Sequence, residues 1–173
     1  MSRGENRFGP LLGLAVVAWF FRAVGPELYG TAALTTNLLA AVVIQAGLLL
    51  SPARLAGWAL LVGLFWDALS FSALGHHVLV IGLTALLVRT QRGWWLGASA
   101  GEQAAGSVLA AVSYFGLDRF FHLVETRSWD WPFSLSVSLV VAGVANGLVS
   151  VVLGWWLERV EGFPIRRVSR RPR

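Results

Sequence analysis

Long apolar runs constrain this chain more than any other feature of its sequence. Six such runs lie between charged or turn-forming residues, and each has the composition of a membrane-spanning helix. One span needs about 20 residues, so six use about 120 of the 173 residues and leave room only for short loops and tails. The predicted spans are Pro10–Val24, Leu34–Leu50, Leu55–Phe71, Leu74–Val88, Leu96–Leu117 and Leu135–Leu157.

The low charge of the chain excludes most soluble classes of protein. Asp, Glu, Lys and Arg make up 13% of the residues, against about 25% in an ordinary soluble domain. The absence of cysteine excludes disulfides, thiolate nucleophiles and cysteine-ligated zinc. We therefore predict an all-α polytopic membrane protein. Its six-helix transmembrane bundle forms one domain over residues 1–162, and a basic cytoplasmic tail follows over residues 163–173.

The arginines predict the orientation of this bundle. All 14 basic residues are arginine, and eleven of them fall on one side if both termini are cytoplasmic, against two on the other. Positively charged loops are retained in the cytoplasm, so we predict a multi-pass protein with both termini inside. This rule, together with attraction to membrane lipids, accounts for the net charge of +5, and we predict no nucleic-acid partner.

Three charged residues lie inside the predicted spans, where charge is costly and usually functional. At about 1.5 Å of rise per residue, Arg22 and Asp67 both lie about 18 Å from the cytoplasmic boundary, whereas Glu102 lies about 9 Å deep. An ion pair between Arg22 and Asp67 would neutralise both charges. Such a pair would serve either packing or function, and the sequence leaves both interpretations open.

Small residues recur at helical spacing on three segments. Such stripes let two helix backbones approach closely, either within the bundle or against a partner helix, and the sequence does not distinguish the two. Asn146 lies beside the second stripe, where a buried amide needs a hydrogen-bond partner. The stripes are Ala59, Gly63, Asp67 and Ser70; Gly143, Gly147, Ser150 and Gly154; and Gly97, Gly101 and Ala104.

The sequence offers little support for catalysis. No serine lies in a nucleophile elbow, and Asp67 has no second carboxylate three or four residues away. His76 and His77 are adjacent, so we expect their side chains to diverge on a helix. Asp67 is expected to lie about one and a half turns too deep to complete a metal site with them. We therefore predict no enzymatic activity, no metal and no cofactor.

The segment from Gly63 to Gly75 resembles the signature of the MreD family, the bacterial rod shape-determining membrane proteins. That family carries G-x-x-x-D-x-x-S-G-S-x-L-G between its third and fourth spans, and this chain departs from it at Phe71, where glycine is usual. Asn37, the pair Asn146-Gly147 and the segment from Trp155 to Arg159 also resemble the family. The matching motif positions are Gly63, Asp67, Ser70, Ser72, Leu74 and Gly75.

The resemblance implies a function without catalysis. It implies a scaffold of the cell-elongation machinery in the bacterial inner membrane, which regulates cell shape and sidewall peptidoglycan synthesis. Its implied partners are a bitopic MreC-like protein and other proteins of the elongation complex, with no small-molecule substrate. The family's fold is similar to that of the substrate-binding subunits of energy-coupling-factor vitamin transporters. A transport subunit, with the outer loop Asp118–Phe133 over a polar pocket, is therefore the alternative, and an intramembrane enzyme is a third, weaker one.

The predicted orientation is testable with topology reporters. Reporters fused at Met1 and at Arg173 are expected to report the cytoplasm, because the arginine-rich segments lie beside them. A reporter inserted near Thr126 is expected to report the opposite side. Termini found on opposite faces would show that the six-span prediction is wrong.

Overall fold

The computed structural model describes residues 7–29, 38–70, 72–127 and 133–160, and every regular element in these ranges is a helix. The all-α prediction is therefore confirmed for the described part of the chain. Both Asn37 and Phe71 lie outside it, as do the tail over residues 163–173 and the latter part of the predicted outer loop. The helices are α1 (Phe8–Tyr29), α2 (Leu38–Leu49), α3 (Pro52–Ser70), α4 (His76–Thr90), α5 (Arg92–Gly97), α6 (Ala100–Thr126) and α7 (Phe133–Val160).

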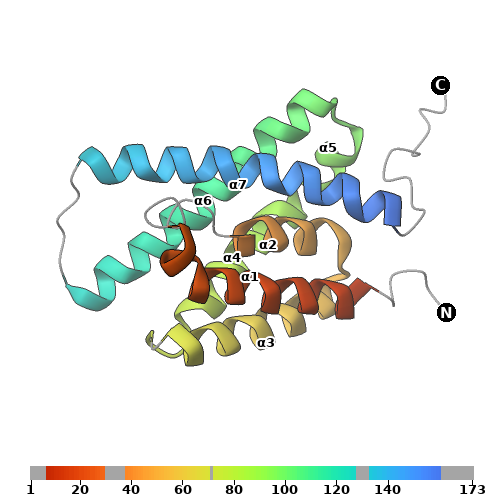
Figure 1. Cartoon of the computed structure of the whole chain (residues 1–173). Helices are drawn as coiled ribbons and strands as arrows, with labels where there is room; N and C mark the ends of the chain where they lie inside the picture. Colours follow the sequence, from red (N-terminus) through yellow and green to blue (C-terminus); the bar gives the residue numbers. More distant parts are fainter. Residues whose placement is uncertain (1–6, 30–37, 71, 128–132, 161–173) are drawn as a thin grey trace, which may run out of the picture.

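The helix α2 forms the centre of the molecule. Every residue from Leu39 to Gly47 is buried, and α1, α4, α6 and α7 pack around it (Figure 1). A helix that is apolar on all faces is stable only when it is covered all round. Its one polar side chain, Gln45, donates a hydrogen bond of 2.8 Å to the carbonyl oxygen of Ser150 on α7. This hydrogen bond connects the central helix α2 to α7, the longest of the outer helices.

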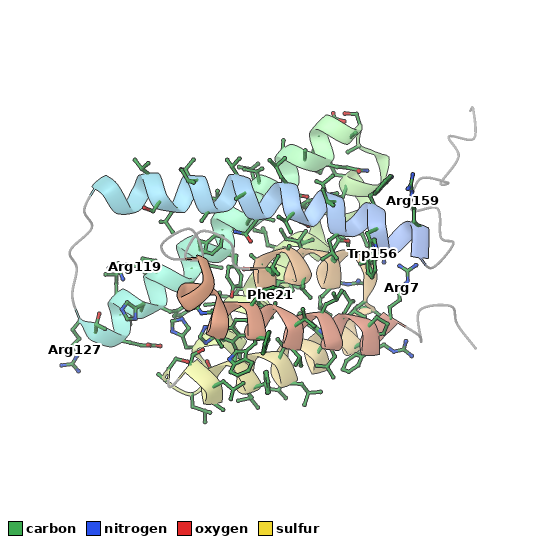
Figure 2. All side chains as sticks on the ribbon, viewed as in Figure 1. Arg7, Phe21, Arg119, Arg127, Trp156 and Arg159 are labelled. Carbon is green, nitrogen blue, oxygen red and sulfur yellow. The ribbon has the colours of Figure 1, made fainter. Side chains whose placement is uncertain are left out.

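The two ends of the bundle carry different charged residues. Figure 2 shows Arg7, just before α1, and Arg159 of α7 at one end, and Arg119 of α6 and Arg127, just after α6, at the other. The turn between α3 and α4 lies at the same end of the bundle as the end of α6 (Figure 1), where Figure 2 labels Arg127. We call this the distal end. The start of α1 and the finish of α7 therefore lie together, at the end opposite the α3–α4 turn.

The predicted fifth span is divided in the structure. The short helix α5 finishes at Gly97, and α6 begins at Ala100 with a capping box. The backbone N–H of Ser99 donates to the Glu102 carboxylate at 2.6 Å, and the backbone N–H of Glu102 donates to the Ser99 hydroxyl at 3.4 Å. Glu102, which the sequence placed about 9 Å inside the fifth predicted span, is an exposed residue in the first turn of α6. The helix then continues to Thr126, so the first part of the predicted outer loop is helical.

The small residues of α7 pack inside the molecule. A Cβ atom on Gly147 would lie 2.5 Å from the Cα of Val108, and one on Gly143 would lie 2.2 Å from a methyl group of Val112, both on α6. Ser150 accepts a hydrogen bond from Gln45, and a Cβ on Gly154 would lie 2.9 Å from the same amide. This stripe therefore serves packing of α7 against α6 and α2. By contrast, a Cβ on Gly97 or Gly101 would meet nothing within 4 Å.

Large apolar side chains are exposed on the outer faces of the bundle. They occur on α1, α3, α4, α6 and α7, with Phe20, Leu61 and Val152 more than half exposed. Within the described ranges, two helical stretches combine the length and the apolar composition needed to cross a membrane, Pro52–Ser70 and Val137–Leu157. Three further apolar helical stretches are shorter: Phe8–Ala23, Leu38–Leu49 and His76–Thr90.

A matched pair of glycine substitutions tests the packing of α7 against α6. Alanine in place of an open helical glycine is favourable by about 0.5–1 kcal/mol, so Gly57→Ala on α3, which meets nothing within 4 Å, is expected to be neutral or stabilising. Gly147→Ala is expected to destabilise by about 1–3 kcal/mol, because its methyl group would overlap the backbone of Val108. Thermal unfolding in detergent measures both. Equal effects of the two substitutions would contradict the observed helix contact.

Candidate functional site

The carboxylate of Asp67 holds the turn between α3 and α4. The side chain is 2% exposed and lies one turn before the end of α3. It accepts hydrogen bonds from the backbone N–H of Gly75 at 2.7 Å, the backbone N–H of His77 at 2.8 Å and the hydroxyl of Ser72 at 3.0 Å. These donors belong to the turn and to the first residues of α4. One carboxylate thus satisfies backbone groups that a helix start leaves without intrahelical partners.

Two glycines allow this turn to close. A Cβ on Gly63 would lie 2.5 Å from the Cα of Val78, so only glycine lets α4 approach α3 this closely. Gly75 has a φ of 96°, a left-handed conformation that strains other residues. The spacing of Gly63, Asp67, Ser72 and Gly75 therefore has a structural explanation as the frame of a tight helical hairpin. Leu74 lies in the same turn but is 84% exposed.

Both histidines of the turn face carboxylates of α6. The Nε2 atom of His76 lies 3.1 Å from Asp118 Oδ1, and its Nδ1 atom lies 2.6 Å from Glu125 Oε1. The Nε2 atom of His77 lies 3.9 Å from the same Asp118 oxygen. Both imidazoles are buried, and their ring centroids are 4.8 Å apart. We call His76, His77, Asp118 and Glu125, together with Asp67, the distal cluster.

This arrangement corrects the prediction that the adjacent histidines diverge and that Asp67 lies too deep to join them. The Nδ1 atom of His77 lies 2.8 Å from Asp67 Oδ1, because α4 begins beside the last turn of α3 rather than beyond it. The rings of His76 and His77 lie 4.8 Å apart between their centroids, and both Nε2 atoms face the same oxygen of Asp118. The sequence analysis missed both Asp118 and Glu125. Their spacing of seven residues, which places them on one face of a helix, was the available signal.

The ion pair between Arg22 and Asp67 that the sequence suggested does not form in the structure. In the described ranges no salt bridge joins these two residues, and the Arg22 side chain is exposed. The positive charge of Arg22 instead favours the ionised form of Asp118, a residue that lies just beyond the fifth predicted span. Partial burial raises the pKa of Asp118, but its hydrogen bond with His76 and the nearby positive charge of Arg22 are among the causes that hold it below its ordinary value.

The other predicted polar positions have separate roles. Asn146 is buried in α7 and donates a hydrogen bond of 2.8 Å to the carbonyl of Ala142, one turn earlier in the same helix. Ser70 is half-buried at the end of α3. The structure therefore brings together Asp67 and Ser72 of the predicted residues, but not Arg22 or Asn146. The arrangement around Asp67 can hold a cation or a bound proton, since two imidazoles face three carboxylates.

Comparison with known proteins gives no relative for this chain: no family model, curated protein or solved structure matches it. The resemblance to the MreD family therefore depends on the residues quoted above, chiefly the motif from Gly63 to Gly75.

Single and double substitutions test whether Asp67 stabilises the α3–α4 turn or forms an ion pair with Arg22. Asp67→Asn is expected to lower the free energy of unfolding by about 1–3 kcal/mol, because buried donors of the turn lose an acceptor. Arg22→Ala is expected to change it little, and the double variant is expected to show the sum of the single effects. Thermal unfolding in detergent measures all three. A double variant milder than Asp67→Asn alone would show that the two charges are paired.

Proposed function

We propose that the chain is a six-span protein of the bacterial cytoplasmic membrane, with both termini in the cytoplasm. The exposed apolar side chains on α1, α3, α4, α6 and α7 support this. Exposure of apolar surface to water is unfavourable, and membrane lipid would cover it. The guanidinium of Arg159 lies 3.7 Å from the ring centroid of Trp155, an arrangement typical of a membrane interface. With Arg7 at the same end, this end fits the cytoplasmic face (Figure 2).

The short central helix is compatible with this proposal. Twelve residues rise about 18 Å, less than the hydrocarbon thickness of about 30 Å. A segment buried within protein need not cross the bilayer as one helix, because its ends can be satisfied by neighbouring groups rather than by lipid. Since α2 is covered by four other helices, its length does not argue against a membrane bundle.

Within that membrane we propose a non-enzymatic scaffold of the cell-elongation machinery. In this role the chain binds an MreC-like bitopic protein and thereby regulates cell shape and sidewall peptidoglycan synthesis. The main support for this proposal is the arrangement of the motif residues. Gly63, Asp67, Ser72 and Gly75 build a tight turn, whereas Leu74 projects from it with 84% of its surface exposed. A fixed turn presenting an apolar side chain is suited to contact with another protein.

The distal cluster supports a second candidate, a substrate-binding subunit of a small-molecule transporter. The side chains of Asp118 and Glu125 are 37% and 30% exposed, so a ligand can reach them from the distal end. A polar site open to the outside is what such a subunit requires. Equilibrium binding of vitamin-sized ligands to the purified chain distinguishes this candidate from the scaffold.

Co-purification in detergent tests the scaffold proposal. Leu74→Ala is expected to reduce recovery of the MreC-like partner about tenfold, the loss that about 1.4 kcal/mol of contact energy produces. Leu109→Ala on α6 is the matched control, because this leucine is also largely exposed, at 67%, and belongs to a different part of the surface. Its recovery of the partner is expected to match that of the unaltered chain.

Membrane levels of each variant are measured alongside, so that loss of contact is separated from loss of protein. Equal recovery with Leu74→Ala and with the unaltered chain would remove Leu74 as the contact. Failure of the unaltered chain to recover any such partner, together with tight binding of a vitamin-sized ligand, would favour the transport subunit.

A further inference from the structure

We propose that the distal cluster binds one divalent transition-metal ion, most suitably Zn²⁺, through Nε2 of His76, Nε2 of His77 and Oδ1 of Asp118. This inference is independent of the proposed function, because it depends only on the geometry of these side chains. Imidazole nitrogen and carboxylate oxygen are ligands that Zn²⁺ prefers. Each of the three residues offers one such atom, and the three atoms lie within 4.8 Å of one another.

The separations are close to those of a tetrahedral site. An ion with bonds of about 2.0 Å holds its ligand atoms about 3.3 Å apart. The two distances from Asp118 Oδ1, 3.1 Å to Nε2 of His76 and 3.9 Å to Nε2 of His77, lie on either side of this value. Small side-chain rotations would therefore bring all three atoms onto one ion. Three protein ligands leave the fourth position for water or for a group supplied by another molecule.

Hydrogen bonds at the far side of each ring prepare the Nε2 atoms for a cation. The Nδ1 atom of His76 faces Glu125 at 2.6 Å, and that of His77 faces Asp67 at 2.8 Å. Because a carboxylate accepts, each Nδ1 carries a proton, and an ion in the cluster would take the lone pair of each Nε2 in place of any proton bound there. A carboxylate behind a ligating imidazole is the usual support in zinc sites, where it fixes the ring and raises its basicity.

The atoms that converge in the cluster need a positive charge between them. With both rings neutral, the Nε2 lone pairs face an oxygen of Asp118, which is also an acceptor. The three carboxylates of the cluster carry three negative charges, and Arg22, whose charge acts on Asp118, offsets one. A divalent ion would neutralise the remaining two. The alternative source of positive charge is a proton on His76, which would bridge Glu125 and Asp118.

Metal titration of the purified full chain tests the proposal. The protein, in detergent and without a polyhistidine tag, is titrated with Zn²⁺ in competition with a chromophoric chelator, and with Co²⁺ as a spectroscopic probe. We expect one ion per chain, intense visible Co²⁺ absorption typical of tetrahedral coordination, and a higher melting temperature with Zn²⁺. A folded, monodisperse chain that binds neither ion would overturn the proposal in favour of the bridging proton.

Variants distinguish this site from adventitious binding. His76→Gln and Asp118→Asn are expected to abolish the Co²⁺ absorption, and Glu125→Gln, behind the ligand, is expected to weaken binding by about 10–100-fold. The matched control is His122→Gln, which removes the third histidine of the chain, an exposed residue of α6 outside the cluster. It is expected to bind as the unaltered chain does. An equal loss in the His122 and His76 variants would show adventitious binding only. If a ligand variant fails to fold, the proposed site is tested by the stoichiometry of the unaltered chain and by the effect of Glu125→Gln on affinity.

Discussion

A single buried carboxylate organises the distal end of this helical bundle. Asp67 accepts two backbone N–H groups and a hydroxyl from the turn that follows α3, so opening the turn would leave these donors without their acceptor. Each unsatisfied buried group costs about 1–3 kcal/mol, which makes the closed turn strongly favoured. Because α4 starts directly after the turn, the same carboxylate fixes where His76 and His77 meet α6. The architecture of the hairpin and the chemistry of the cluster therefore depend on one residue.

Much of the helical architecture was predictable, because an apolar block between charged or turn-forming residues has few alternatives to a helix. The predicted segments beginning at Pro10, Leu55 and Leu135 each coincide closely with an observed helix, α1, α3 and α7. The boundaries around α6 were wrong for a local reason. Ser99 and Glu102 form a capping box that starts a new helix, and this spacing was present in the sequence but was not used.

The distal cluster was not predictable from spacing along one helix. Its members come from the end of α3, the start of α4 and the last turns of α6, and their meeting depends on two features of the tertiary structure. The left-handed Gly75 and the close approach at Gly63 bring His77 beside Asp67. The continuation of α6 beyond Leu117 brings Asp118 and Glu125 to the histidines. Counting depth along one helix could not identify partners of Asp67 that belong to the next turn.

We propose that the turn held by Asp67 lies outside the cell, at the opposite end of a membrane bundle from Arg159. The chain contains no cysteine, so single-cysteine variants can be labelled without background. In intact cells, a membrane-impermeant maleimide is predicted to label Leu74→Cys and to leave Arg159→Cys unlabelled until the cells are permeabilised. Labelling of both variants in intact cells, or of Leu74→Cys only after permeabilisation, would contradict this orientation of the bundle.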